Sequence, residues 1–140
     1  MWGVRDRGMV LRVIDGDSIE VRLSDGENKV VKLLGVNTPE TVHPFKPVEC
    51  YGPEASKYVE DKLTGKKILL EYGHIKEDGY GRMLAYVYVG RIFINEDLVR
   101  KGYARVYRKF PFKWKTRFID IEEKAQEKNK GLWEKCPQTI

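Results

Sequence analysis

The sequence predicts a small, mainly β-structured barrel that also carries a few helices. Short runs with the apolar alternation typical of strands are separated by turns that contain glycine. Three segments with helical spacing each end at a glycine, and the sequence contains no internal repeat. At 140 residues the chain fits one domain, residues 1–140, which is large enough to bury most of its apolar surface without disulfides.

Three strands are predicted at the start of the chain. The residues from Met9 to Ile14 and from Ile19 to Leu23 show the side-chain alternation of strands. Asp15-Gly16-Asp17 lies between them as a tight turn. Residues 24–28 form another turn, which leads into a third strand from Lys29 to Gly35.

A long loop is predicted from Thr38 to Pro53. Its prolines each remove a backbone donor, so the segment fits neither a helix nor a sheet; they are Pro39, Pro44, Pro47 and Pro53. Pro53 also opens a helix that Gly65 ends, because proline is favoured at the first helical position. The apolar positions of that helix are Ala55, Tyr58, Val59 and Leu63.

The second half of the chain predicts further strands and two more helices. The strands are Ile68–Tyr72 and a hairpin of Met83–Val89 with Arg91–Ile94 across Gly90. Asn95 is expected to cap a short helix from Glu96 to Lys101 that ends at Gly102. The last helix is expected from Thr116 to Lys130, with Phe118, Ile121 and Ala125 facing inward and Gly131 as its stop.

The positive charge of the chain is concentrated in one stretch. The net charge is +5, but the segment from Leu98 to Ile119 holds eight basic residues and no acid, so the rest carries 18 basic and 21 acidic residues, or −3. Aromatic residues alternate with these basic ones: Tyr103, Tyr107, Phe110, Phe112, Trp114 and Phe118. Bases stack on aromatic rings while basic side chains follow phosphates, which favours a nucleic-acid partner. Phe118 is expected in the core, and two or three of the rings at most are expected to face a ligand.

Membrane insertion and cysteine-based metal binding are not predicted. No apolar run approaches the roughly 18–20 residues of a membrane span. Residues 1–10 contain Arg5, Asp6 and Arg7 and no apolar core of a signal peptide, so the chain as given is expected to be cytoplasmic unless a leader was removed. Cys50 and Cys136 lack metal-type spacing; free thiols are expected, with a single disulfide as the alternative.

Four short motifs occur in a fixed order along the chain. They are Asp15-Gly16-Asp17-Ser18, Asn37-Thr38-Pro39-Glu40-Thr41, Tyr51-Gly52-Pro53-Glu54-Ala55-Ser56 and Asp78-Gly79-Tyr80-Gly81-Arg82. In this order and spacing they resemble the staphylococcal nuclease (thermonuclease) family, from about Val13 to Tyr107 and more weakly through Gly131-Leu132-Trp133. The resemblance implies a fold that is mainly β with helices, a five-stranded OB-fold barrel plus three α-helices, which is a known platform for nucleic-acid ligands.

The resemblance also implies a calcium site. In the family, Asp17 is a metal-binding carboxylate and the backbone oxygen of Thr38 is a second ligand, and Ca²⁺ accepts such mixed oxygen donors. Asn37 stands where the family usually has aspartate, so the charge of the direct ligands falls from −2 to −1 and weaker calcium binding is expected. Asp15 and Glu49 are the nearest candidates by sequence for a replacement carboxylate. From composition alone, the Asp-Gly-Asp segment is equally typical of a simple turn.

The implied catalytic residues are Lys32, Glu40 and Arg82. Glu40 matches a glutamate that helps a water attack phosphorus, and Arg82 matches an arginine that grips the scissile phosphate. Lys32 replaces a second phosphate-binding arginine, and a single ammonium keeps the charge but loses the planar fork. Without the resemblance, all three would be interpreted as ordinary surface residues.

These residues predict a metal-dependent, monomeric endonuclease that hydrolyses single-stranded DNA and RNA. Tyr80 matches a nucleotide-contacting position, and Tyr107 lies near others. Sequence preference is expected to be slight, because the chain has no base-reading motif such as a zinc finger. The alternative is a non-catalytic nucleic-acid-binding barrel, which the changes at Asn37 and Lys32 would fit. A third interpretation, an OB-fold that mediates protein contacts, leaves the clustered positive charge without a role.

Overall fold

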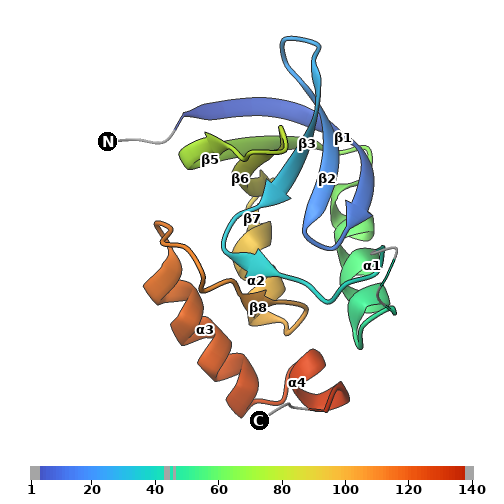
Figure 1. Ribbon diagram of the computed structural model, residues 1–140, viewed down its shortest axis with the longest axis vertical. Helices are drawn as coiled ribbons and strands as arrows, with labels where there is room; N and C mark the ends of the chain where they lie inside the picture. Colours follow the sequence, from blue (N-terminus) through green and yellow to red (C-terminus); the bar gives the residue numbers. More distant parts are fainter. Residues whose placement is uncertain (1–3, 43–44, 46, 138–140) are drawn as a thin grey trace.

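Five strands form a closed barrel in the computed structural model, which describes residues 4–42, 45 and 47–137. They are β1 (Arg5–Asp15), β2 (Ser18–Leu23), β3 (Asn28–Leu33), β5 (Lys67–Glu77) and β6 (Met83–Val89) (Figure 1). The strands follow the order β3-β2-β1-β5-β6, and β3 closes the ring by pairing in parallel with β6. The predicted five-stranded OB-fold barrel is confirmed. The fourth predicted strand, Ile68–Tyr72, extends as β5 through Glu77.

Three further strands are short and lie outside the barrel. Strand β7 (Ile92–Phe93) pairs with β6 as the expected hairpin. Strand β4 (Val36–Asn37) pairs antiparallel with β8 (Arg105–Val106), a pairing between segments almost 70 residues apart that the local sequence pattern did not predict. This small sheet places the basic stretch next to the loop that follows β3.

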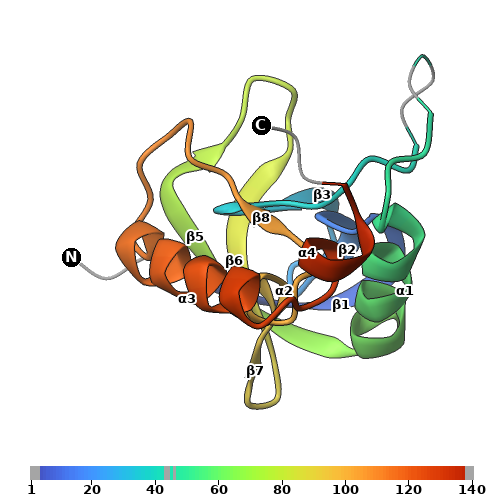
Figure 2. The same ribbon diagram turned by 90° about the horizontal axis from the view of Figure 1, so that it is seen from below.

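Four helices accompany the barrel where three were expected. They are α1 (Gly52–Leu63), α2 (Ile94–Arg100), α3 (Lys115–Glu127) and the additional one-turn helix α4 (Leu132–Lys135). Helix α3 ends three residues before the predicted end, and Asn129 beyond it adopts a left-handed conformation with φ 53°. Figure 2 shows α4 beside the segment that enters α1. No helix in the described part of the chain combines the length and apolar character needed to cross a membrane.

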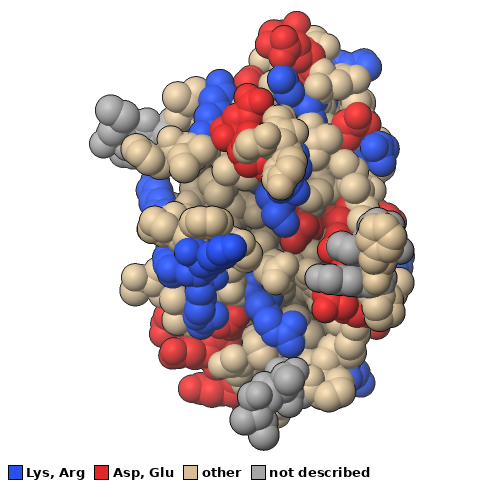
Figure 3. Space-filling view, viewed as in Figure 1, with Lys and Arg blue, Asp and Glu red and all other residues tan. Residues whose placement is uncertain are grey.

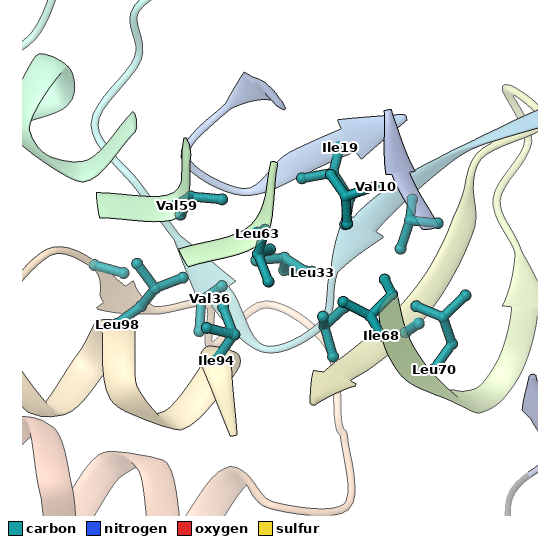
Figure 4. Close-up of a cluster of buried hydrophobic side chains, with 14 of the residues drawn as sticks. Val10, Ile19, Leu33, Val36, Val59, Leu63, Ile68, Leu70, Ile94 and Leu98 are labelled. Atoms are coloured by element: carbon teal, nitrogen blue, oxygen red, sulfur yellow. The ribbon is translucent and has the colours of Figure 1, made fainter. Parts of the chain in front are cut away.

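The hydrophobic core fills the barrel and continues between the barrel and two helices (Figure 4). Side chains that point inward from the strands, such as Val10, Ile19 and Leu33, meet Leu63 of α1 and Leu98 of α2. All of these are almost completely removed from solvent. Phe118 of α3 is also buried, as its position in the sequence predicted. The barrel is therefore packed solid, and its loops are the places where ligands can bind.

Asn95 does not cap α2 as predicted. The helix begins at Ile94, two residues before the predicted start at Glu96, and the fully buried Asn95 amide bonds to the barrel instead. Its Oδ1 accepts the N–H of Val87 at 2.8 Å, and its Nδ2 donates to the carbonyl oxygens of Leu34 at 2.9 Å and Ala85 at 3.2 Å. Buried backbone groups at this junction need partners, and that need outweighs the local capping preference.

Cys50 and Cys136 form a disulfide, which corrects the expectation of free thiols. Their Cα atoms are 5.8 Å apart although 86 residues separate them in the sequence. The bond joins the loop before α1 to the end of α4. Sequence spacing could not show this, because the two cysteines meet only after the C-terminal helices have packed against the barrel.

Candidate active site

The turn between β1 and β2 holds two buried carboxylates. Asp15 is 7% exposed and Asp17 is 5% exposed. Asp15 Oδ1 accepts hydrogen bonds from the Gly16 N–H at 2.7 Å and from Thr41 Oγ1 at 2.9 Å. Burial raises the pKa of Asp15, the charges of Asp17 and Glu40 raise it further, and the two hydrogen bonds oppose this shift. The turn therefore contributes negative charge to the site, and Asp15 also anchors the loop that carries Thr41.

Asp17 connects this turn to two other predicted site residues. Its Oδ2 lies 2.9 Å from the Lys32 ammonium of β3 and accepts the Thr38 N–H at 3.3 Å. Its carbonyl oxygen accepts the Leu33 N–H at 2.8 Å, so the turn is also held by the backbone of β3. The structure therefore brings Asp17, Lys32 and Thr38 together, as the sequence predicted, and it adds a direct ion pair that the sequence did not.

Two glycines of the sequence motifs allow the loop from Thr38 to Thr41 to pack closely. A Cβ atom added at Gly16 would lie 2.8 Å from Thr38 Oγ1, and one added at Gly52 would lie 2.7 Å from Thr41 Cγ2. Real Cβ atoms do not approach other atoms this closely, so neither position accepts a side chain unless the loop moves. The motifs Asp-Gly-Asp and Tyr-Gly-Pro thus have one shared structural role, which is to support this loop.

Glu40 is held within the same loop by Glu49. The Glu40 N–H donates to Glu49 Oε1 at 2.6 Å, and the Glu49 N–H donates to the Glu40 carbonyl oxygen at 2.8 Å. The Glu40 side chain accepts the Val42 N–H through Oε1 at 3.1 Å. Glu49, which the sequence suggested as a replacement carboxylate, uses its own carboxylate to position the Glu40 backbone.

The donor atoms around Asp17 suit a hard cation. The implied ligands are the Asp17 carboxylate, the Asn37 amide oxygen and the Thr38 carbonyl oxygen, all of which are oxygen donors of the kind that Ca²⁺ accepts. Among the described residues, no group of three or more His, Cys, Asp or Glu side chains is arranged to hold a metal ion. Asn37 is exposed, and the buried Thr38 Oγ1 has no hydrogen-bond partner among the same residues. The donor set therefore fits Ca²⁺ in chemistry, with one carboxylate and neutral oxygens.

Arg82 and Tyr80 lie in the turn between β5 and β6. Arg82 Nε forms an ion pair with Asp78 Oδ2 at 2.7 Å, while Asp78 Oδ1 accepts the N–H groups of Tyr80 at 2.8 Å and of Arg82 at 2.9 Å. Burial acts to raise the pKa of Asp78, but these hydrogen bonds and the guanidinium lower it overall. The turn is thus a closed unit that presents Tyr80, 89% exposed, beside Arg82.

The pairing of β3 with β6 places the cations Lys32 and Arg82 on the same side of the barrel. Lys32 is the register partner of Leu84, and Arg82 lies two residues before Leu84. Alternate strand residues share a face, and two positions along a strand span about 6–7 Å. Arg82 comes directly before β6 begins, so the two cations occupy neighbouring positions along the β3–β6 pair.

Tyr107 directly follows β8 and lies beside the turn between β3 and β4. Its N–H donates to the Gly35 carbonyl oxygen at 2.9 Å, and its ring centroid is 6.0 Å from that of Phe110. The two rings are 38% and 58% exposed. Among the rings of the basic stretch, these two are the exposed ones in the described part of the chain.

Most cations of the basic stretch are neutralised within the fold. Arg100 and Arg117 pair with Glu96, Lys101 with Asp97, Arg108 with Glu122 and Lys113 with Glu71. In the part of the chain that the structure describes, the three cations of the stretch without a carboxylate partner are Arg105, Lys109 and Lys115. Figure 3 shows Lys and Arg side chains along the middle of the face that carries β3 and β8. The charge available to a polyanion is therefore smaller than the sequence count.

Arg105 is the site residue that the sequence did not single out. It is the register partner of Asn37 in the β4–β8 pair, and paired residues share a face of the sheet. Its guanidinium also lies 5.1 Å from the ring centroid of Trp133, the second residue of α4. No local pattern could reveal these contacts, because they join three segments that are distant in the sequence.

Comparison with known proteins agrees with the sequence motifs. Residues 30–135 match the family described as staphylococcal nuclease homologues. The chain is 43% identical over 125 residues to the thermonuclease of Staphylococcus hyicus, which covers 89% of this chain and 73% of that protein. It is 41% identical over 129 residues to the thermonuclease of Staphylococcus intermedius, with 91% and 76% covered. It is also 37% identical over 129 residues to the endonuclease YncB of Bacillus subtilis, with 89% and 60% covered. The chain belongs to the staphylococcal nuclease family.

Proposed function

We propose that this protein is a metal-dependent endonuclease that hydrolyses single-stranded DNA and RNA with little sequence preference. The observation that carries the proposal is the contact of the Asp17 carboxylate with both the Lys32 ammonium and the Thr38 N–H, beside the loop that holds Glu40. Relatives that cover most of the chain are named as thermonucleases, and another is named as an endonuclease.

The proposed metal ion is Ca²⁺, held by Asp17, Asn37 and the Thr38 carbonyl oxygen. When bound, it would supply positive charge that stabilises the negative charge growing on the phosphate. The single carboxylate among these ligands makes its affinity lower than that of a site with two.

The remaining chemistry is assigned to side chains of this chain. Glu40 orients a water molecule and accepts its proton as the water oxygen attacks phosphorus. Arg82 and Lys32 bind the non-bridging oxygens, whose charge increases in the pentacoordinate transition state. The P–O5′ bond then breaks, which leaves a 3′-phosphate on one product and a 5′-hydroxyl, after protonation, on the other. To bind the phosphate, the Arg82 guanidinium must break its ion pair with Asp78.

Substrate binding is assigned to the exposed rings and the cations near them. Tyr80 and Tyr107 offer flat surfaces on which any base can stack, so affinity does not require a particular sequence. A single strand is favoured because its bases are available for stacking. We further propose that the protein acts as a monomer, since all the residues assigned here come from one chain.

The alternative function is nucleic-acid binding without cleavage. Two observations favour it: Asn37 brings no charge to the metal site, and Lys32 already occupies an oxygen of Asp17. Yet Asp17, Glu40 and Arg82 are all present, so we place the nuclease first.

The test is an assay of the purified protein on labelled single-stranded DNA and RNA, with Ca²⁺, Mg²⁺, Mn²⁺ or chelator. We expect metal-dependent cleavage, a loss of roughly 10²–10⁴ in rate for Glu40→Gln, and a gain at low Ca²⁺ for Asn37→Asp. Glu54→Gln, which changes an exposed glutamate in the first turn of α1, is the matched control and should cleave like the wild type.

The outcomes separate the two functions. Full activity in Glu40→Gln would remove that residue from the mechanism. If no form cleaves with any metal but the wild type still binds the strands in a salt-sensitive way, the protein is a binding barrel.

A further inference from the structure

A cavity of about 730 Å³ adjoins the candidate active site on the side of the C-terminal helices. It lies between the active-site loop, which contributes Pro39, and the C-terminal segment, which contributes Gln126 and Trp133. Arg105 of β8 and the disulfide Cys50–Cys136 also line it. Sites that bind small molecules have volumes of about 300–1,000 Å³, so one nucleotide would fit.

The cavity and the active-site loop share Pro39. Pro39 stands between Thr38 and Glu40, both of which are assigned to catalysis or metal binding. Arg105 stands opposite Asn37 in the β4–β8 pair, so its side chain leaves the sheet on the same face. A strand whose scissile phosphate lay at Glu40 and Arg82 would therefore reach this cavity with a neighbouring nucleotide.

Arg105 has the properties of a phosphate-binding residue in this position. Its guanidinium rests over the Trp133 ring at 5.1 Å, and no carboxylate within the described residues is close enough to pair with it. Stacking on a ring fixes a guanidinium while its edge N–H groups stay available to oxygen acceptors. Among the three cations of the basic stretch that have no carboxylate partner within the described residues, Arg105 is the one that lines the cavity. Glu49 also lines the cavity, and its Oε1 accepts the Glu40 N–H.

We propose that this cavity is a subsite for a nucleotide next to the scissile phosphate, with Arg105 on its phosphate and Trp133 at its base. The inference rests on the proposed function, because it assigns a further part of the same substrate. The occupant is a polynucleotide rather than a free anion because the lining holds one cation, Arg105, and one acid, Glu49, and therefore has no net charge to attract a free anion, while Pro39 connects it to the active-site loop.

The experiment measures binding of oligothymidylates of two to eight nucleotides in chelator, by fluorescence anisotropy of labelled strands. The wild type is compared with Arg105→Gln, which removes the cation, and with Gln126→Glu, which adds a negative charge to the cavity lining. The matched controls are Arg91→Gln, in the exposed turn between β6 and β7, and Asn28→Asp, at the start of β3. Both control positions are exposed, and neither is among the residues that line the cavity.

We expect affinity of the wild type to rise with strand length, and both cavity variants to lose at least about fivefold on the longer strands, which corresponds to about 1 kcal/mol. Binding of the dinucleotide should change less. For Arg105→Gln, the slope of log affinity against log salt should fall by about 0.7, the value for one phosphate contact on a single strand. Both controls should behave like the wild type.

Unchanged affinity of both cavity variants on long strands would overturn the inference, as would a wild type without length dependence. An equal loss of affinity at every strand length would overturn it too, since that result would place Arg105 at the nucleotide of the scissile phosphate and not at its neighbour. Binding in chelator needs no cleavage. A separate cleavage assay of the wild type therefore tests the proposed nuclease activity, while the binding experiment tests the subsite alone.

Discussion

Lys32 and Asn37 differ from the family pattern in a related way. Asn37 removes one negative charge from the implied metal ligands, and Lys32 places a cation 2.9 Å from the carboxylate that remains, on Asp17. An arginine at position 32 has a longer, forked head that suits two phosphate oxygens, whereas an ammonium acts as a compact point charge. In this chain, Lys32 can therefore either neutralise Asp17 or bind phosphate, and a metal ion at Asp17 would favour the second role.

We predict that Lys32→Met raises the affinity for Ca²⁺ severalfold while it lowers the affinity for single strands. The substitution removes the cation that competes for Asp17 and keeps an unbranched side chain on β3. Isothermal titration calorimetry with Ca²⁺ alone gives the first quantity, and anisotropy with a labelled strand gives the second.

The control for this prediction is Lys29→Met on the same strand. Lys29 contacts Glu27 at 3.8 Å on the surface, and exposed pairs of this kind contribute little. It should leave Ca²⁺ binding as in the wild type. Calcium affinity that stays constant or falls in Lys32→Met would show that the ion pair with Asp17 does not compete with the metal.

At the scale of elements, α2 is fixed to the barrel by one buried amide. The Asn95 side chain forms hydrogen bonds with the backbone of Val87 and Ala85 in β6 and of Leu34, the residue after β3. We predict that Asn95→Ala lowers the free energy of unfolding by about 2–3 kcal/mol, because it leaves the Val87 N–H and two carbonyl groups without their partner. Denaturant unfolding measures this loss.

Asn28→Ala provides the comparison for Asn95→Ala. Asn28 is exposed and accepts one hydrogen bond from Arg22, so its loss should stay within about 0.5 kcal/mol. Equal effects of the two substitutions would mean that the buried amide contributes no more than a surface contact.

The sequence predicted the elements whose signals are local. Alternation and glycine turns located β1, β2, β3 and β6, and Pro53 with Gly65 located α1. Asn95 was misassigned because a cap and a buried bridge have the same residue type, and only the tertiary structure decides between them. The short strands β4 and β8 were missed because two-residue strands have no periodic pattern.

For the candidate site, too, the residues within local motifs were predicted, and the contacts between distant segments were not. The motifs predicted Asp17, Thr38, Glu40 and Arg82 as residues of one site. The ion pair of Lys32 with Asp17 was not predicted, because it depends on how the strands pack in three dimensions. Arg105 was noted only as part of a charged stretch. Its position beside Asn37 follows from a strand pairing across the molecule, which a single sequence does not encode in any local pattern.

At the scale of the whole molecule, the site depends on segments from both ends of the chain. The β1–β2 turn, the loop from Thr38 to Thr41 and the turn that carries Arg82 belong to the barrel, while β8 reaches the site from the C-terminal part. Glu122 of α3, which is almost fully buried, accepts the Val106 N–H at 2.7 Å and pairs with Arg108 at 2.7 Å. It thereby holds both neighbours of Tyr107 in place.

The disulfide Cys50–Cys136 completes this connection. Cys50 directly follows Glu49, the residue that holds the Glu40 backbone, and its partner ends α4. We predict that the double substitution Cys50→Ser, Cys136→Ser lowers the free energy of unfolding by about 2–4 kcal/mol, since a crosslink across 86 residues restricts the unfolded chain. Guanidinium unfolding of the variant and of the wild type, with and without reductant, measures the effect.

The reduced wild type should unfold like the double variant, and reductant should leave the variant unchanged. Cleavage should decline at a lower temperature in the variant, because the loop that carries Glu40 loses its attachment to α4. A serine variant as stable as the oxidised wild type would show that packing of α4 alone holds the two ends together. Stability lost without any change in the temperature profile of cleavage would separate the disulfide from the active-site loop and confine its role to the unfolded chain.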